Sequence, residues 1–209
     1  MRLTIATLIV LIAGATTYAS KSEGDTANDM VMLANQSEVI YISDTPENSI
    51  TELYSQESQP ELYCMALNVY HESRSDNLAG QFAVSDVVLN RVEDPRYPDT
   101  ICGVVYEGPV YESWKTRNTP DPDDAVFYPR KHRCQFSWYC DGVSDVPRQP
   151  HAWRKAQEVA YHIVNSGMFR GITEGATHYH ATYVNPSWNK TMIEVGRIGE
   201  HIFYKSLPK

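Results

Sequence analysis

The apolar residues of this chain form two groups that a polar stretch separates. A short apolar run occupies the N-terminus, and from residue 61 onwards apolar residues recur at the spacing of amphipathic helices. The intervening residues 20–60 are rich in Ser, Asn, Asp, Glu and Thr and show little periodicity, apart from a short strand that residues 38–42 favour. This composition is typical of a disordered linker. We therefore predict one folded domain over residues 61–209 behind a mostly disordered, acidic linker.

Three helices are predicted in this domain from their apolar periodicity. Pro60 stands where the first helix can begin, because proline is tolerated in the first helical turn. Gly167 is well placed to end the third helix, since glycine adopts the left-handed conformation of many helix ends. The three predicted helices are 61–73, 78–91 and the stretch from Pro150 to just before Gly167.

The remaining segments predict shorter elements. Residues 96–108 are interpreted as a loop with a short helix, and residues 109–133 as an irregular excursion rich in Pro and Asp. Alternating residues near the C-terminus favour strands at 177–182 and 201–204, with a turn at Asn185–Pro186. Helices therefore dominate over a small sheet, which predicts a single α+β domain of lysozyme-like size.

The apolar N-terminus predicts export. Arg2 precedes an apolar run, and Thr17 and Ala19 occupy the positions that a signal peptidase reads, so residues 1–19 are typical of a signal peptide. A signal anchor is the alternative, because residues 3–19 have about the minimum length of a membrane span. Either segment places the rest of the chain outside the cytoplasm.

The net charge of −8 is concentrated in the linker, where residues 20–60 sum to −7. The predicted domain is therefore close to neutral. It lacks the basic excess of a protein that binds nucleic acid through its phosphates, and we exclude that class of partner.

Four cysteines lie inside the predicted domain, and an even number in an exported chain favours disulfides. Four cysteines allow three pairings, of which we favour Cys134 with Cys140 and Cys64 with Cys102. A zinc site is the alternative, but the chain has no CxxC pair and its spacings match no common zinc finger.

Glu72 is the sharpest candidate for chemistry. It lies in the last predicted turn of the first helix, just before a polar break, where a carboxyl group can point into a cleft while the helix stays packed. Partial burial raises the pKa of a carboxyl group, as a general acid near neutral pH requires. The spacing alone is equally typical of an exposed glutamate paired with Arg74.

Seven sequence blocks, taken in order and spacing, resemble the SleB-type cell wall hydrolases, a family of spore-forming and Gram-negative bacteria and their phages. They cover about residues 61–205. The blocks are LYCMALNVYHESR (62–74), GQFAV (80–84), VLNRV (88–92), YPDTICGVVY (97–106), CQFSWYCDG (134–142), GATHYH (175–180) and IGEHIFY (198–204).

The resemblance implies a lysozyme-like or lytic-transglycosylase-like domain that cleaves glycan strands of peptidoglycan between N-acetylmuramic acid and N-acetylglucosamine. The family stretch Tyr-x-Glu-Ala-Arg-Gly-Glu places its first glutamate on Glu72, the implied general acid and base. Asp76 replaces the second glutamate, which leaves it a supporting role at most. A lytic transglycosylase needs only one carboxyl group, whereas a muramidase needs a base, for which Asp76 or Asp141 is a candidate. No cofactor or metal is implied.

Further residues are candidates for substrate contact. Gln135, Ser137 and Trp138 lie in the cysteine-bounded loop, although packing is an equal alternative for this loop. His178 and His180 share one face of a predicted strand, with Tyr179 on the other. Core hydrogen bonding and metal binding are the alternatives for the histidines. The full set of predicted substrate contacts is Tyr70, Asp76, Gln135, Ser137, Trp138, His178, Tyr179 and His180.

The resemblance also implies a setting. We expect an exported monomer that acts on peptidoglycan in the periplasm or the cell-wall space. Residues 3–19 resemble the signal-anchor-release segments of some phage endolysins, so transient membrane contact and phage-induced host lysis fit this pattern. Two rival functions remain: a zinc-dependent peptidoglycan amidase or peptidase, and a wall-binding module without activity.

Overall fold

The computed structural model describes residues 30–31, 40–41, 53–117 and 121–207. The predicted signal segment 1–19 and most of the predicted linker lie outside these residues. Strand β1 (Met30–Val31) pairs antiparallel with β2 (Ile40–Tyr41), and β2 falls within the predicted strand at 38–42. None of the helices in the described residues is both long enough and apolar enough to span a bilayer.

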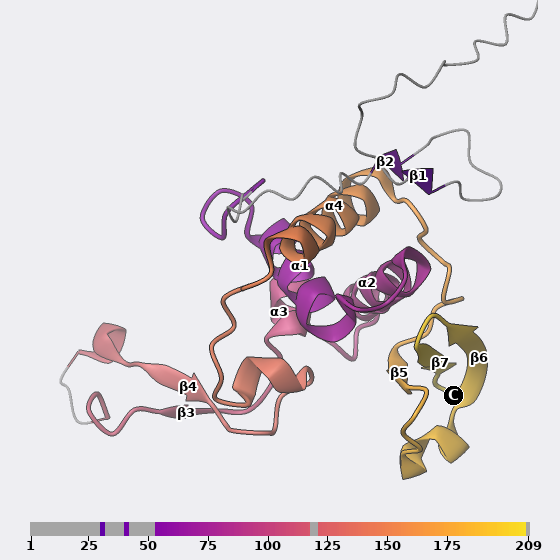
Figure 1. The fold of residues 1–209 in the computed structure, drawn as a ribbon. Helices are drawn as coiled ribbons and strands as arrows, with labels where there is room; N and C mark the ends of the chain where they lie inside the picture. The colour runs from indigo at the N-terminus through magenta and orange to yellow at the C-terminus, as the bar shows by residue number, and fades with distance from the viewer. Residues whose placement is uncertain (1–29, 32–39, 42–52, 118–120, 208–209) are drawn as a thin grey trace, which may run out of the picture.

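Helix α1 (Pro60–Ser73) is the centre of the domain (Figure 1). It packs against α2 (Leu78–Glu93), α3 (Ile101–Val105) and α4 (Pro150–Ser166). Because it has neighbours on several sides, apolar residues lie almost all around it, and every residue from Cys64 to Tyr70 is buried. The three helices predicted from the sequence are confirmed.

The helix ends follow local chemistry. The Asn77 side chain caps α2 by accepting a hydrogen bond from the backbone N–H of Gly80 at 2.9 Å. Gly167 ends α4 in the left-handed conformation, with φ 64°, as its position predicts. The first residues of α3 bind a carboxylate, because Glu61 Oε2 accepts from the N–H of Ile101 at 2.6 Å.

Two disulfides confirm the favoured pairing. Cys64 on α1 is bonded to Cys102 on α3, and Cys134 is bonded to Cys140 around a loop that contains the short 3-10 helix η2 (Ser137–Cys140). The first bond fixes α3 to the central helix. The second closes the loop that follows β4.

A three-stranded antiparallel sheet lies beside α2 in the order β5-β7-β6. Its strands are β5 (His178–Ala181), β6 (Ile193–Ile198) and β7 (His201–Lys205), and the 3-10 helix η3 (Ser187–Thr191) precedes β6. Phe203 of β7 is fully buried against Ala83, Val84 and Val87 of α2. The predicted strands 177–182 and 201–204 are confirmed, whereas β6 was not predicted.

The prediction of an irregular segment at 109–133 was wrong in one respect. Strands β3 (Val110–Glu112) and β4 (Phe127–Pro129) form an antiparallel hairpin that projects from the helices (Figure 1). The 3-10 helix η1 (Pro122–Asp124) lies between them. Each strand has only three residues, too few for the alternation that reveals a strand in a sequence.

The last residues before α1 belong to the domain. Tyr54 is buried, and its hydroxyl donates to the backbone carbonyl of Gln157 on α4 at 2.7 Å. The N–H of Leu53 donates to Oε1 of the same glutamine at 2.8 Å. The chain is therefore attached to α4 several residues before α1 begins.

Candidate active site

Glu72 lies in the last turn of α1 and lines a pocket of about 260 Å³. The carboxyl group is therefore beside a cavity, as the sequence predicts, and does not point into open solvent. Three walls surround it: the end of α2, the Cys134–Cys140 loop, and the sheet with η3. The lining residues are Glu72, Arg91, Gln135, Phe136, Ser137, His178, Tyr179 and Trp188.

The pKa of Glu72 is under opposing influences. Burial raises it above the ordinary value, because a low-dielectric surrounding disfavours the carboxylate. The hydroxyl of Tyr179 donates to Glu72 Oε2 at 3.1 Å, and this hydrogen bond and the positive charge of Arg91 both lower it. Burial is the largest of the three, so the net pKa is raised. This carboxyl group can give a proton away and take one back.

Tyr179 can act only as a donor to Glu72. Burial and the neighbouring Glu72 carboxylate raise the pKa of its phenol well above the ordinary value, so the hydroxyl stays protonated. Its ring packs against His201 and Phe203 of β7, with centroids 5.2 and 5.7 Å away. The sheet therefore holds the phenol in place beside the carboxyl group.

Arg91 contacts all three walls of the pocket, and it was not predicted from the sequence. It is only 5% exposed, and its Nε donates to the backbone carbonyl of Thr177 at 2.8 Å, just before β5. Its guanidinium lies over the rings of Tyr97 and Phe136, at 5.4 and 5.3 Å from their centroids. The available signal was a charged residue within the apolar pattern of α2.

His178 and Trp188 form the sheet side of the pocket. Burial, together with the positive charge of Arg91, lowers the pKa of His178, which favours the neutral imidazole near neutral pH. The indole of Trp188 lies 5.6 Å from the His178 ring, centroid to centroid. Trp188 was not predicted, because a single tryptophan in a loop gives no sign of which residues it will meet.

Gln135 and Ser137 are exposed on the opposite wall. Phe136, between them, is buried in the main core while still lining the pocket. Exposed and buried side chains thus alternate along the disulfide loop, with two polar side chains on either side of one packed ring. Of the predicted contact residues, the structure brings Gln135, Ser137, His178 and Tyr179 together with Glu72.

Tyr70 and Trp138 do not line the pocket. Their polar atoms form hydrogen bonds within the protein. The hydroxyl of Tyr70 accepts from the backbone N–H groups of Arg148 and Gln149, at 3.0 and 3.2 Å. The indole of Trp138 donates to Asn68 Oδ1 at 3.3 Å and is buried in the main core. Both aromatic side chains support the loops around the pocket.

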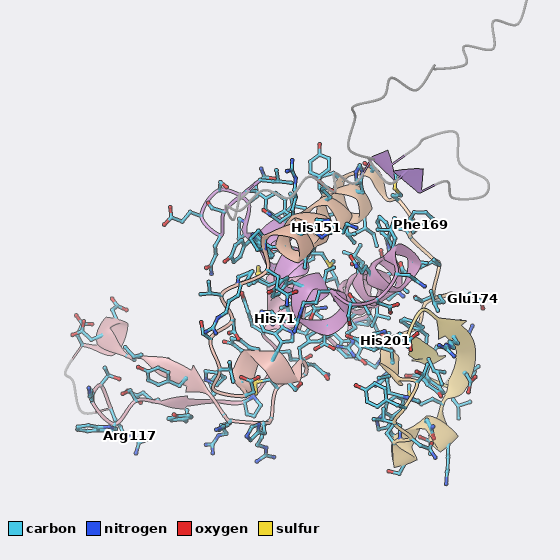
Figure 2. The ribbon with its side chains drawn as sticks, viewed as in Figure 1. His71, Arg117, His151, Phe169, Glu174 and His201 are labelled. Atoms are coloured by element: carbon cyan, nitrogen blue, oxygen red, sulfur yellow. A yellow bond between two sulfur atoms is a disulfide. The ribbon has the colours of Figure 1, made fainter. Side chains whose placement is uncertain are left out.

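Asp76 is also turned away from the pocket. Its side chain is 3% exposed, and its Oδ2 accepts from the N–H of Glu200 at 3.0 Å and lies 3.1 Å from His201 Nδ1. Figure 2 shows His201 on the side of the sheet nearest the helices. A Cβ atom at Gly80 or Gly199 would come within 2.1 or 2.3 Å of this carboxylate, so neither position has room for a side chain. Asp76 therefore connects the α1–α2 turn to the β6–β7 turn.

The other predicted polar residues have partners elsewhere. His180 Nε2 lies 3.0 Å from the hydroxyl of Tyr204, and Asp141 accepts from the N–H of Val143 at 2.6 Å. Neither lines the pocket. Among the described residues, no group of three or more His, Cys, Asp or Glu side chains is arranged to hold a metal ion.

Comparison with known proteins agrees with the sequence blocks. The chain is similar to the spore cortex-lytic enzymes of Bacillus subtilis (36% identical over 146 residues, 70% of this chain and 38% of that protein) and Oceanobacillus iheyensis (27% over 161 residues, 77% and 46%). It thus spans less than half the length of these relatives. The catalytic domain of the germination-specific lytic transglycosylase SleB from Bacillus anthracis is 28% identical, with 75% of this chain and 100% of that chain covered and a TM-score of 0.47.

The two spore cortex-lytic enzymes confirm the resemblance to SleB-type hydrolases. A family model described as cell wall hydrolase matches residues 75–204, beginning just after Glu72. The match takes in more than half of the chain. The chain therefore belongs to the cell wall hydrolase family.

Proposed function

We propose that this protein cleaves the glycan strands of peptidoglycan between N-acetylmuramic acid and N-acetylglucosamine, with Glu72 as the single general acid and base. The observation that carries the proposal is the half-buried carboxyl group of Glu72 in its pocket, with a raised pKa. Among the described residues, Glu72 contributes the only carboxyl group to the pocket lining.

The first step needs the protonated form of Glu72, which burial favours. The carboxyl group gives its proton to the glycosidic oxygen, and the bond from that oxygen to C1 of muramic acid breaks. Positive charge then develops at C1 and its ring oxygen, as in an oxocarbenium ion. Glu72 is left as a carboxylate, which the Tyr179 hydrogen bond and the charge of Arg91 stabilise.

The second step uses the same carboxylate as a base. It takes the proton of the C6 hydroxyl of the muramic acid, whose oxygen attacks C1 and forms a 1,6-anhydro ring. Glu72 is protonated again, so the cycle closes without a second carboxylate. For this reason we favour a lytic transglycosylase over a muramidase, which requires a base to activate water.

The polar side chains of the pocket suit a sugar substrate. Gln135 and Ser137 offer hydrogen-bonding groups to hydroxyl or acetamido oxygens from one wall, and Trp188 offers an aromatic face from the other. We assign Tyr70, Asp76, Trp138 and His180 to the support of these walls, because their polar groups already have protein partners.

Membership of the cell wall hydrolase family is consistent with action at the cell wall. We further propose that the protein is exported, that residues 1–19 serve as the signal peptide or anchor, and that the protein acts as a monomer. Mass spectrometry of the exported protein would test the first part, since cleavage after Ala19 removes the segment and an anchor retains it.

The test of the activity compares the wild-type protein with the Glu72→Gln variant on purified sacculi. We expect the wild type to release muropeptides with 1,6-anhydromuramyl ends, and the variant to lose at least about a thousandfold in rate while keeping its circular dichroism spectrum. Products with reducing muramic acid ends would show that the enzyme is a muramidase and not a lytic transglycosylase. Free stem peptides, or activity that a chelator abolishes, would support the amidase instead.

A further inference from the structure

The β3–β4 hairpin carries a surface that the proposed reaction does not use. Here the arm means residues 109–117 and 121–133. Six of the thirteen large apolar side chains exposed in the described residues belong to it, and Trp114, at 77%, is one of the two most exposed. They are Val110, Tyr111, Trp114, Val126, Phe127 and Tyr128. Apolar exposure is therefore concentrated on this one projection, and such concentrated exposure marks binding surfaces.

The geometry of the arm explains why these rings stay exposed. Tyr111 pairs across the hairpin with Tyr128, and their ring centroids lie 6.0 Å apart. The next pair is Glu112 with Phe127, which points to the opposite face because side chains alternate along a strand. In the described residues the two strands form a two-stranded sheet by themselves.

The base of the arm is attached to the catalytic pocket. The N–H of Gln135 donates to the carbonyl of Glu107 at 2.9 Å, and the N–H of His132 donates to the carbonyl of Cys140 at 2.9 Å. The arm thus emerges from the Cys134–Cys140 loop, whose Gln135 and Ser137 line the pocket. His178 and Trp188 line the pocket from the sheet, and Figure 1 shows the sheet and the arm on opposite sides of the helices.

The charges along the arm indicate what it meets. Its base carries the exposed basic run 130–133, and its far part carries the exposed Asp121, Asp123 and Asp124. Figure 2 shows Arg117 near that far end, well away from the helices. Three carboxylates at the far end oppose insertion of the arm into a lipid bilayer. Aromatic faces beside polar groups suit a sugar chain, and the basic run complements the carboxylates of peptidoglycan stem peptides.

We propose that the arm is a second binding surface for the glycan strand, on which Tyr111, Trp114 and Tyr128 stack against sugar rings beyond the catalytic pocket. The proposal rests on the proposed function, because a polymeric substrate that crosses the pocket continues along the disulfide loop towards the arm. Lys115 Nζ lies 5.8 Å from the centre of the Trp114 ring, so a cation accompanies the most exposed ring of the arm.

The experiment measures binding without turnover. Full-length Glu72→Gln protein is mixed with purified sacculi, and the bound fraction after sedimentation is compared with that of the same protein carrying Tyr111→Ser, Trp114→Ser and Tyr128→Ser. We expect the affinity to fall by about tenfold or more, as for the loss of central aromatic contacts in an interface. The matched control is Tyr161→Ser on α4, a tyrosine 49% exposed outside the arm, which should bind as before.

Several outcomes would overturn the proposal. Unchanged sacculus binding by the triple variant would refute it, and so would an equal loss in the Tyr161→Ser control. Vesicles of phosphatidylethanolamine and phosphatidylglycerol serve as the second probe, and a loss confined to vesicles would make the arm a lipid-binding device. Trp114 lies outside the paired strands, so the single variant Trp114→Ser tests binding even if the triple variant unfolds. A failure of the proposed function is seen separately, because Glu72→Gln protein that still releases soluble muropeptides would show that Glu72 is not the catalytic acid.

Discussion

The hydrogen bond between Tyr179 and Glu72 allows a quantitative prediction. Tyr179→Phe removes the hydroxyl that donates to Glu72 Oε2 at 3.1 Å and leaves the packed ring in place. A hydrogen bond to a charged group contributes about 1.5–3 kcal/mol, which corresponds to about a 10- to 150-fold change in an equilibrium constant. The bond stabilises the carboxylate, so its loss increases the proton affinity of Glu72 by about this factor.

The sign of the effect on the pH profile follows directly. In the proposed mechanism the protonated form of Glu72 starts the reaction, so activity is expected to fall as the pH rises through the pKa of Glu72. A higher proton affinity keeps Glu72 protonated to higher pH, so the alkaline limb of the rate profile moves upward in pH. The assay is the initial rate of sacculus solubilisation across a pH series, with Tyr183→Phe as control because Tyr183 is 87% exposed. A folded Tyr179→Phe protein whose alkaline limb stays in place, or moves downward, would refute the reasoning.

Two further predictions concern stability, and urea unfolding would measure both. Replacing Cys64 and Cys102 by Ala should lower the free energy of unfolding by about 4 kcal/mol, and replacing Cys134 and Cys140 by Ala should lower it by about 2 kcal/mol. The first disulfide spans 38 residues and the second only 6, so the first restricts the unfolded chain more. Equal losses would contradict this account. Asp76→Ala should cost about 1–3 kcal/mol, because it leaves the buried His201 and the N–H of Glu200 without their carboxylate partner, while the released muropeptides stay the same. A changed product pattern with unchanged stability would mean that Asp76 contacts the substrate.

The sequence was sufficient to predict the helices because each signal was local. Pro60 and Gly167 mark helix ends through their own backbone preferences, and the apolar stripe of α4 has the period of one element. The hairpin and β6 were not predicted. Residues 193–198 contain a glycine and two charged residues, and the pairing with β7 has a bulge between Glu194 and Gly196 that interrupts the alternation of side chains.

The candidate site was predicted in part for the same reason. Glu72 and the polar residues of the cysteine loop lie in recognisable blocks, and they do meet at the pocket. Arg91 and Trp188 reach it only through tertiary packing, which spacing along a single chain does not encode. Asp76 resembles a catalytic carboxylate in sequence, but Glu200 and His201, more than a hundred residues later, decide its role.

The burial of α1 on several sides has a consequence for how this protein loses activity. The backbone amides of such a helix exchange with solvent only when the surrounding core opens, so those of residues 65–70 belong to the most protected unit of the domain. Glu72 extends from the same helix, which means that the acid cannot be released by local fraying of a loop. Inactivation by denaturant and the loss of amide protection in α1 should therefore occur as one cooperative event.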